Sequence, residues 1–221
     1  MDKYLNVFYN FNLKPKTDYP AKLANYLINR YKIQPGAEIL DVGCGRGDLL
    51  RAFAKEGLLT QGLDLMPYDM ELTAGLPIKH ANFESERFPF EDESFDLVFS
   101  KSVIEHLHKP DNFLREARRV LKTGGRLIIM TPDWQTQLYT FYNDHTHVQP
   151  YIVSGLINAL KLYELNDVTA ELFYQLPSVW KFPFLKIFYK PLQLLFPVKK
   201  VRKSSWWRWA RELMILGSAI K

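Results

Sequence analysis

Short apolar runs alternate with amphipathic segments along most of the chain. Residues 38–42 form an apolar run that glycines close, which is typical of a buried strand. Residues 48–56 then place apolar side chains, among them Leu49, Leu50 and Phe53, on one face of a helix. A strand, a glycine loop and a helix in this order form the first unit of a dinucleotide-type α/β fold.

The same alternation predicts the remaining elements. We expect further strands at residues 59–65, 78–83, 95–100, 126–130, 170–175 and 212–221. We expect further helices at residues 20–33, from Pro110 to the pair Gly124–Gly125, and at 151–165. Because strands alternate with helices of this length, the pattern indicates a mostly parallel sheet with helices on both faces.

Composition favours one globular domain. The chain has 221 residues, of which 47% are hydrophobic and 24% charged, so we expect residues 1–221 to form a single domain. Cys44 is the single cysteine, which excludes an internal disulfide and a zinc site built from several cysteines. Residues 1–16 lack the apolar core of a signal peptide, so we expect a cytoplasmic protein.

The net charge of +5 is concentrated in one segment, residues 176–211, between the last two expected strands. This insertion has nine basic residues, no acidic residue and nine aromatic residues. Basic and aromatic side chains together favour peripheral contact with an anionic membrane at its inner face. A helical lid, buried against this domain or a partner, is the alternative. Lys and Pro interrupt every apolar run before about 18 residues, so we do not expect a membrane span.

The strongest chemical signal is the loop after the first strand, Asp41-Val-Gly43-Cys-Gly45-Arg-Gly47. Its glycines allow a tight turn and close approach of backbone to a ligand, while the following helix presents free N–H groups. Asp64 ends the second strand, nineteen residues after Gly45, where a carboxylate can accept hydrogen bonds from both ribose hydroxyls. Loop and acid together predict a site for a nucleotide-like ligand.

These motifs resemble those of class I S-adenosylmethionine-dependent methyltransferases, of the type 11-like group that methylates small molecules, quinones and glycans. The glycines follow a GxGxG spacing instead of the GxGxxG of nicotinamide enzymes, which disfavours a nicotinamide oxidoreductase. Further similar segments follow in order within residues 36–132: Asn82-Phe83, residues 88–96, residues 100–107 (SKSVIEHL) and residues 121–126. The resemblance implies a Rossmann-like α/β fold with seven strands, the last of them antiparallel.

The resemblance also implies S-adenosyl-L-methionine as cofactor and a set of residues that bind it. The expected cofactor-binding residues are Asp41, Gly43, Cys44, Gly45, Gly47, Asp64, Leu65, Asn82, Phe83, Ser100 and Lys101. Within this set, Asp41 and the glycine loop would hold the methionine part, Asp64 the ribose, and Asn82 the adenine amino group. The family usually has Asp where Asn82 stands, and Asn82 and Phe83 also fit an ordinary loop and core.

Histidines are the candidate bases for methyl transfer. A base is needed only when the acceptor is weakly acidic, such as a hydroxyl group. His106 is the leading candidate, and His145 or His147 could orient the acceptor or act as base. Each could instead be purely structural.

We expect no metal, although one alternative stays open. Some related methyltransferases bind a divalent metal through a Glu-x-x-Glu-His set at the place of residues 102–106, where Ser102 here replaces the first Glu. Glu105, His106 and a histidine of the 145–147 loop are the candidate ligands.

The expected reaction is methyl transfer to an oxygen of a small-molecule, glycan or lipid-linked acceptor. An RNA-directed methyltransferase is the first alternative, because the basic aromatic insertion also suits phosphates and stacked bases. Ser100-Lys101-Ser102-Val103 differs from the Pro-Pro-aromatic motif of base-amino methyltransferases, which argues against that class of nucleic-acid enzyme. A non-catalytic, cofactor-binding partner subunit is the second alternative.

Overall fold

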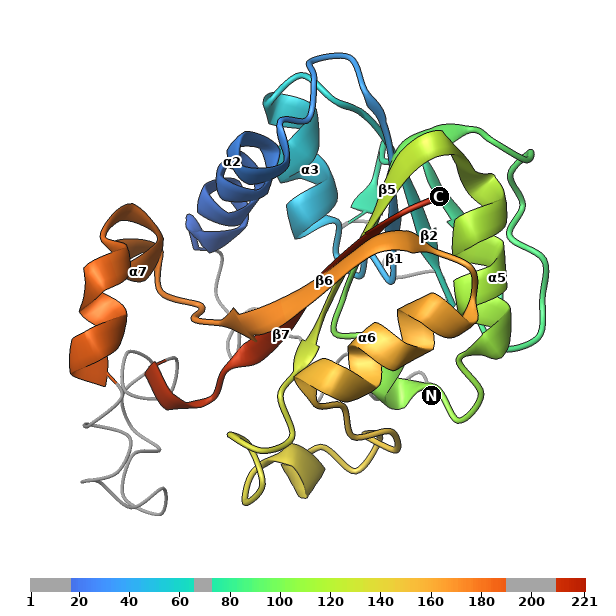
Figure 1. Ribbon diagram of the computed structural model, residues 1–221. Coiled ribbons are helices and arrows are strands. Elements are labelled where there is room, and N and C mark those ends of the chain that lie inside the picture. Colours follow the sequence, from blue (N-terminus) through green and yellow to red (C-terminus); the bar gives the residue numbers. More distant parts are fainter. Residues whose placement is uncertain (1–16, 66–72, 190–209) are drawn as a thin grey trace.

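The computed structural model describes residues 17–65, 73–189 and 210–221. A single sheet of seven strands runs through the molecule in the order β3-β2-β1-β4-β5-β7-β6 (Figure 1). The strands are β1 (Glu38–Val42), β2 (Leu59–Asp64), β3 (Ile78–His80), β4 (Phe95–Lys101), β5 (Leu121–Pro132), β6 (Asn166–Phe173) and β7 (Met214–Ile220). The helices are α2 (Tyr19–Tyr31), α3 (Asp48–Lys55), α5 (Asp111–Val120), α6 (Val153–Leu162) and α7 (Pro177–Lys181), with short 3-10 helices η1 (Ile104–His106), η2 (Phe141–Asn143) and η3 (Pro183–Leu185).

The strand directions confirm the predicted fold class. Strands β1 to β5 pair in parallel, whereas β7 runs antiparallel to both β5 and β6. The basic aromatic insertion separates β6 from β7 in the sequence, but the two strands pair directly in the sheet. The sheet is therefore Rossmann-like, with its last strand antiparallel as expected.

Helices cover both faces of the sheet because the strands are apolar on both faces. On one face, α5 and α6 pack on side chains such as Leu40, Val42 and Val98. On the other face, α2 and α3 pack on Ile39, Phe99 and their neighbours (Figure 1). Consecutive residues of β1 thus alternate between the two cores, as the period of two in a strand requires. Because helices cover both faces of the sheet, polar side chains gather at the ends of the strands.

One predicted helix boundary was wrong. The helix that begins near Pro110 ends at Val120, before the pair Gly124–Gly125, because Leu121 already has an extended backbone (φ −69°, ψ 137°). The glycines belong to β5 instead. A Cβ at Gly125 would lie 2.8 Å from the carbonyl oxygen of Lys122, so this glycine permits a tight backbone approach where the pairing of β4 with β5 is irregular.

The third strand and the insertion also differ in extent from the sequence prediction. Strand β3 ends at His80, because Asn82 begins a turn in which its side-chain Oδ1 accepts a hydrogen bond from Glu84 N. Within the insertion, α7 packs on the sheet through Trp180, whose ring stacks on Phe173 at 5.3 Å. Residues 190–209 lie outside the described residues. Among the residues that are described, no helix is both long and apolar enough to cross a bilayer.

Candidate functional site

The glycine loop lies between β1 and α3, at the carboxyl end of the sheet. Gly43, Gly45 and Gly47 all have positive φ angles, of 76°, 54° and 73°. A Cβ at Gly43 would overlap the Cγ2 methyl of Val103, which follows β4, so only glycine fits there. The loop therefore brings backbone, rather than side chains, close to the carboxyl ends of β1 and β4. The N–H groups of Gly43 and Gly45 donate to Leu63 O and to Asp64 Oδ2, which ties the loop to β2.

A buried carboxylate lies at the start of this loop. Asp41 is only 2% exposed, and its Oδ2 atom has no hydrogen-bond partner among the described residues. Burial, and to a lesser degree the neighbouring Asp64, raises the pKa of Asp41 to about 8, while the charge of Lys101 opposes that shift. An unpartnered buried carboxylate is costly, and a cationic ligand group would satisfy it.

Asp64 holds the loop from the adjacent strand. Its Oδ2 accepts a hydrogen bond from Gly45 N at 2.8 Å, and its Oδ1 accepts one from Leu65 N at 2.8 Å. A carboxylate oxygen has two lone pairs and can accept more than one hydrogen bond. The carboxylate is 6% exposed. Asp64 thus holds the loop in place, and its carboxylate oxygens are hydrogen-bond acceptors of the kind that ribose hydroxyls need.

Three other predicted cofactor residues, Ser100, Cys44 and Lys101, lie in the glycine loop or at the end of β4. Ser100 is buried, and its hydroxyl donates to the carbonyl oxygen of Val42 at 3.0 Å, which ties β4 to β1 beside the loop. Cys44 is buried too, and burial raises the pKa of its thiol, so it is a small neutral side chain here. Burial lowers the pKa of Lys101, whose charge acts on both Asp41 and Glu105.

The predicted adenine residues, Asn82 and Phe83, follow β3 and have contacts within the protein. Asn82 already uses its Oδ1 to accept from Glu84 N at 2.9 Å, which leaves one lone pair for another donor. Phe83 is 7% exposed and packs edge-on against Phe88 in the core. Residues 66–72, which follow Leu65, lie outside the described residues.

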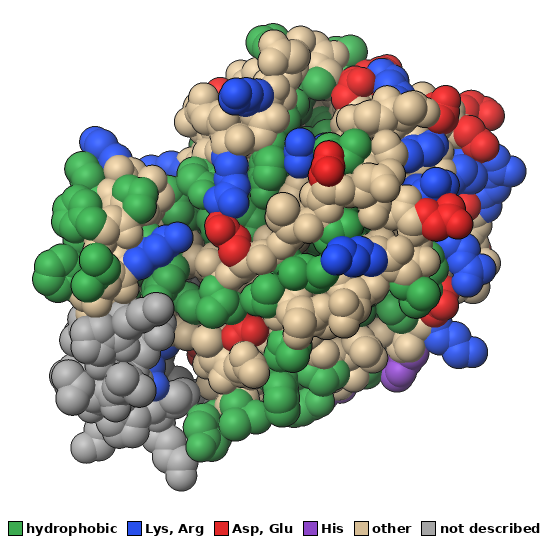
Figure 2. Space-filling view, in the orientation of Figure 1, with side chains coloured by type: hydrophobic (Ala, Val, Ile, Leu, Met, Phe, Trp, Pro, Cys, Tyr) green, Lys and Arg blue, Asp and Glu red, His purple; other side chains and the backbone are tan. Residues whose placement is uncertain are grey.

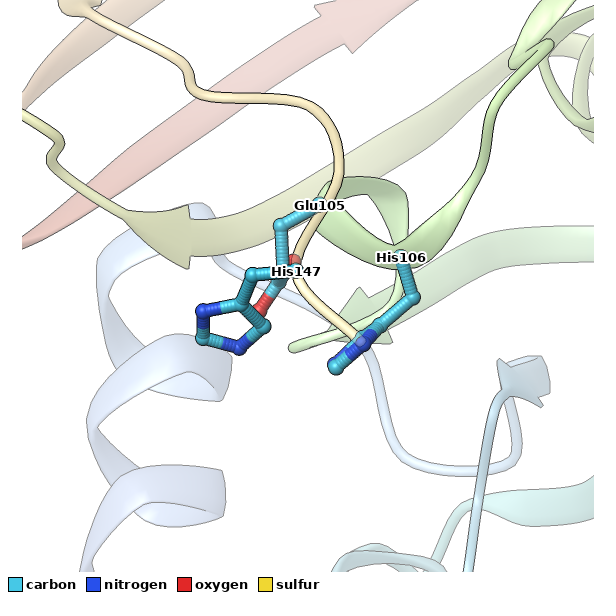
Figure 3. Close-up of side chains that lie close together, drawn as sticks. All are labelled: Glu105, His106 and His147. Atoms are coloured by element: carbon cyan, nitrogen blue, oxygen red, sulfur yellow. The ribbon is translucent and has the colours of Figure 1, made fainter. Parts of the chain in front are cut away.

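A second polar cluster lies just after β4. Glu105 and His106 stand on η1, and His147 comes from the loop after η2, and each side chain has a ligand atom within 4.8 Å of the others (Figure 3). The two imidazole rings meet at a centroid distance of 4.7 Å. The carbonyl oxygen of Glu105 accepts from Val148 N at 2.9 Å and Gln149 N at 3.0 Å, which holds the loop against η1.

The hydrogen bonds of this cluster determine which imidazole nitrogens carry protons. Thr146 Oγ1 donates its one proton to Asp144 Oδ1 at 2.6 Å, so toward His106 Nδ1, at 2.9 Å, it can only accept. His147 Nδ1 lies 2.7 Å from the carbonyl oxygen of Phe141, which also only accepts. Both Nδ1 atoms are therefore donors, and each Nε2 atom bears the lone pair of a neutral ring.

Burial favours the neutral form of both rings. Burial, followed by the repulsion of His147, lowers the pKa of His106, and burial lowers that of His147. Asp144 opposes both shifts by stabilising the protonated rings. A neutral imidazole has a lone pair on Nε2 that can accept a proton.

The structure separates the two histidines of the 145–147 loop. His147 joins His106, whereas His145 is exposed and outside the cluster. Sequence analysis missed Asp144 and Thr146 as the groups that set the His106 tautomer. It also missed two buried polar atoms after β5, Asp133 Oδ1 and Trp134 Nε1, which have no hydrogen-bond partner in the part of the chain that the structure describes. Their position at the end of the predicted strand 126–130 was the only available signal.

Comparisons with known proteins agree with this geometry. Residues 40–129 match the family model described as a methyltransferase domain. The ubiquinone/menaquinone biosynthesis C-methyltransferase of Bordetella avium is 37% identical over 114 residues, which are 48% of this chain and 44% of the relative. The ubiquinone biosynthesis O-methyltransferase of Pseudomonas fluorescens is 28% identical over 135 residues, 58% of each chain. The chain thus spans about half the length of these curated relatives.

A solved structure shares the fold over nearly the whole chain. It is phosphoethanolamine N-methyltransferase 2 of Haemonchus contortus, in complex with phosphomonomethylethanolamine and S-adenosylhomocysteine. The TM-score is 0.66 at 20% identity, and the match covers 99% of this chain and 56% of the other. Residues 40–129 thus match a methyltransferase domain, and the seven-stranded sheet around them shares its fold with a solved methyltransferase.

Proposed function

We propose that this chain transfers the methyl group of S-adenosylmethionine to an oxygen of a small-molecule, glycan or lipid-linked acceptor. The observation that carries the proposal is the buried Asp41 carboxylate, which has one unpartnered oxygen beside a glycine loop and Asp64. The cationic amino group of the cofactor would satisfy Asp41, and its ribose hydroxyls would donate to Asp64. The Haemonchus structure of the same fold contains S-adenosylhomocysteine, which supports this choice of ligand.

The reaction needs the acceptor oxygen aligned with the methyl group of the cofactor, and a base that takes the hydroxyl proton. The acceptor oxygen forms a bond to the methyl carbon while the carbon–sulfur bond breaks, so the cofactor leaves as neutral S-adenosylhomocysteine. Alignment of the two reactants supplies up to roughly 7–11 kcal/mol of such a barrier. The hydroxyl proton goes to a base, and Nε2 of His106 or His147 bears a suitable lone pair. Both rings belong to the turn and loop beside Val103, which packs against Gly43.

Labelled cofactor tests this function directly. The protein is incubated with S-adenosylmethionine carrying a labelled methyl group and with separate lipid, glycan and nucleic-acid extracts. We expect label in the lipid or glycan fraction, in a product that behaves as a methyl ether or ester. Label in the nucleic-acid fraction would favour the RNA-directed alternative. If no fraction is labelled although S-adenosylhomocysteine binds, the chain is a cofactor-binding partner subunit.

We also propose that the described part of the insertion contacts an anionic membrane surface, at the cytoplasmic face. Phe184, Ile187 and Phe188 are 58–71% exposed, and hydrophobic side chains gather over this end of the molecule (Figure 2). Lys181 and Lys186 lie among them in the sequence. Exposed aromatic and aliphatic side chains with interspersed lysines suit the interface of an anionic bilayer.

Vesicle flotation tests this contact. We expect binding to vesicles that contain phosphatidylglycerol at low salt, and weaker binding at high salt. The double variant Phe184→Ser, Phe188→Ser should lose most of this binding. Leu162→Ser is the matched control, since Leu162 is 75% exposed on α6. Failure of the unchanged protein to float at low salt would contradict the proposal.

A further inference from the structure

Four buried side-chain polar atoms have no hydrogen-bond partner among the described residues, and all four lie along one edge of the sheet. They are Asp41 Oδ2, Glu105 Oε1, Asp133 Oδ1 and Trp134 Nε1. Asp41 is near the carboxyl end of β1, Glu105 follows β4, and the other two residues, the β5-end pair, follow β5; these strands are neighbours in the order β1-β4-β5. Ligands of open α/β sheets bind at this edge. The proposed cofactor would satisfy Asp41 and Glu105 belongs to the histidine cluster, but neither accounts for the β5-end pair.

The carboxylate of Asp133 is only half used by the protein. Asp133 is 1% exposed, and its Oδ2 accepts a hydrogen bond from Thr136 N at 2.9 Å. Its carbonyl oxygen accepts from Gln137 N at 3.1 Å, so Asp133 holds the turn that follows β5. Burial raises the pKa of this carboxyl group, although nearby backbone N–H groups oppose the shift. The turn accounts for Oδ2 and leaves Oδ1 for a donor from elsewhere.

Hydrogen bonds connect the β5-end pair to the histidine cluster. Thr131, two residues before the pair on β5, donates to Glu105 Oε2 at 2.9 Å. Gln149 N donates to the carbonyl oxygen of Glu105 at 3.0 Å, and two residues later the carbonyl oxygen of Tyr151 accepts from Trp134 N at 2.9 Å. The β5-end pair is therefore the next place along the sheet edge after the groups that would take the proton of the acceptor.

The β5-end pair offers one acceptor and one donor, which restricts the chemistry of a ligand. An ammonium group only donates, so it would satisfy Asp133 and leave the indole N–H of Trp134 unpaired. A carboxylate or phosphate only accepts, and the charge of Asp133 would repel it. Hydroxyl groups both donate and accept, so a compound with several hydroxyl groups satisfies both residues. A buried polar group left unpaired is costly, which favours such a compound.

The segment after the pair suits an uncharged ring. Residues 134–143 contain no charged side chain, and Figure 1 shows them in yellow beyond the end of β5. Leu138, Tyr139 and Tyr142 in this segment are 48–75% exposed. Tyrosine rings combine apolar area with a hydroxyl group, and a sugar ring likewise has an apolar face and polar edges. A ligand with a net charge would find no opposite charge on this segment.

We propose that Asp133 and Trp134 bind hydroxyl groups of the methyl acceptor, and that the reacting part of this acceptor is an uncharged sugar ring. The inference rests on the proposed function, whose acceptor classes it narrows to glycans. Asp133 Oδ1 accepts from one hydroxyl group, and Trp134 Nε1 donates to a hydroxyl oxygen. These contacts position the ring, while a histidine of the cluster remains the base for the hydroxyl group that is methylated.

Ligand-detected NMR tests this site without reference to activity. Full-length protein saturated with S-adenosylhomocysteine is mixed with the methyl glycosides of glucose, galactose, mannose or rhamnose, and saturation transfer is recorded against glycoside concentration. We expect a saturable signal from at least one glycoside, and weaker signals from glucosamine and glucuronic acid, which carry a charge. Asp133→Asn and Trp134→Phe should each weaken glycoside binding by about tenfold or more, because each removes the partner of a ligand hydroxyl group.

Thermal unfolding separates recognition from a purely structural role. Asp133→Asn keeps the shape of the side chain and an oxygen for Thr136 N, so its unfolding midpoint should not fall. Trp180→Phe is the matched control for the indole, because Trp180 Nε1 donates to the carbonyl oxygen of Tyr174 at 2.6 Å and the ring packs in the core that includes α2. Trp180→Phe should lower the unfolding midpoint and leave glycoside binding unchanged.

Three outcomes would overturn the acceptor site. They are no saturable binding of any neutral glycoside, stronger binding of a charged sugar than of every neutral one, and normal glycoside binding in folded Asp133→Asn or Trp134→Phe. S-adenosylhomocysteine is titrated into the same preparations by calorimetry. Its binding without glycoside binding would refute only the acceptor class, whereas glycoside binding without it would refute the proposed cofactor.

Discussion

Asp41, near the end of β1, and Glu105, just after the neighbouring β4, are two buried carboxylates, and both keep an oxygen without a partner among the described residues. Burial is the first cause of the raised pKa in each, which is about 8 for Asp41 and about 7 for Glu105. Their surroundings differ. Asp41 adjoins a glycine loop that is continuous with it in sequence, whereas Glu105 faces side chains from β5 and from the 141–147 segment.

The comparison shows how one edge of a parallel sheet can hold two kinds of site. In open α/β sheets, ligands bind at the carboxyl ends of the strands. Beside Asp41 the glycine loop allows close approach of a ligand, and the buried carboxylate suits a nucleotide with a cationic end. Ring nitrogens dominate beside Glu105, which suits a proton. The following predictions test this division of roles.

Removal of an imidazole from the cluster should have the largest effect. For His106→Ala and His147→Ala we expect kcat to fall by about 10²- to 10⁴-fold, the range for loss of a positioned proton acceptor. Affinity for S-adenosylhomocysteine should stay the same. Steady-state kinetics and calorimetry measure the two quantities. His145→Ala is the control, and an equal loss of kcat in that variant would remove the distinction between the two loop histidines.

Asp64→Ala should have the opposite effect, in that it should weaken binding of S-adenosylhomocysteine. The variant loses the acceptor for Gly45 N–H and for the proposed ribose hydroxyls, and hydrogen bonds to a charged group contribute about 1.5–3 kcal/mol each. We expect affinity for S-adenosylhomocysteine to fall by about 100-fold, as measured by calorimetry. Asp92→Ala, at an exposed carboxylate before β4, should leave affinity unchanged. Normal affinity in Asp64→Ala would exclude Asp64 from the cofactor site.

Gly43→Ala and Gly36→Ala together should distinguish the cost of a steric overlap from the cost of backbone strain. Gly36 also has a positive φ, of 80°, but a Cβ there would meet nothing within 4 Å. We expect Gly36→Ala to lower the free energy of unfolding by about 1 kcal/mol, through strain alone. Gly43→Ala should cost a further 1–3 kcal/mol or so, because the new methyl group would overlap Val103. Urea denaturation measures both, and equal losses would contradict the close approach.

The smallest effect should be a proton released when the cofactor binds. With a pKa of about 8, Asp41 is protonated at pH 7 before binding. A cationic amino group stabilises the carboxylate and lowers this pKa, so binding releases a proton and affinity rises with pH below about 8. The slope is at most about tenfold per pH unit. Calorimetry in two buffers with different ionisation heats counts the proton. The same release from Asp41→Asn would assign it to another group.

The sequence predicted the glycine-loop region better than the cluster because of how each is built. Asp41, Gly43, Gly45 and Gly47 are adjacent in the chain, so strand, loop and helix could be placed together. The second region depends on contacts across about forty residues, such as the one between Thr146 and His106. The sequence offered His106, His145 and His147 without showing which two would meet.

Fold prediction had a similar limit. The period of apolar residues gave the seven strands and their order along the chain, because buried strands require it. It misplaced the end of α5, since Gly124 and Gly125 are also typical of a helix terminus. Their role in β5 depends on the carbonyl groups of Lys122 and Phe95, which only the folded sheet brings near Gly125.

A crystal structure with S-adenosylhomocysteine tests the central claim most directly. The account predicts the amino-acid end of this molecule within the glycine loop, its amino group against Asp41 Oδ2 and its ribose hydroxyls against Asp64. Density for the ligand elsewhere, or no density beside the glycine loop at saturating ligand, would contradict it.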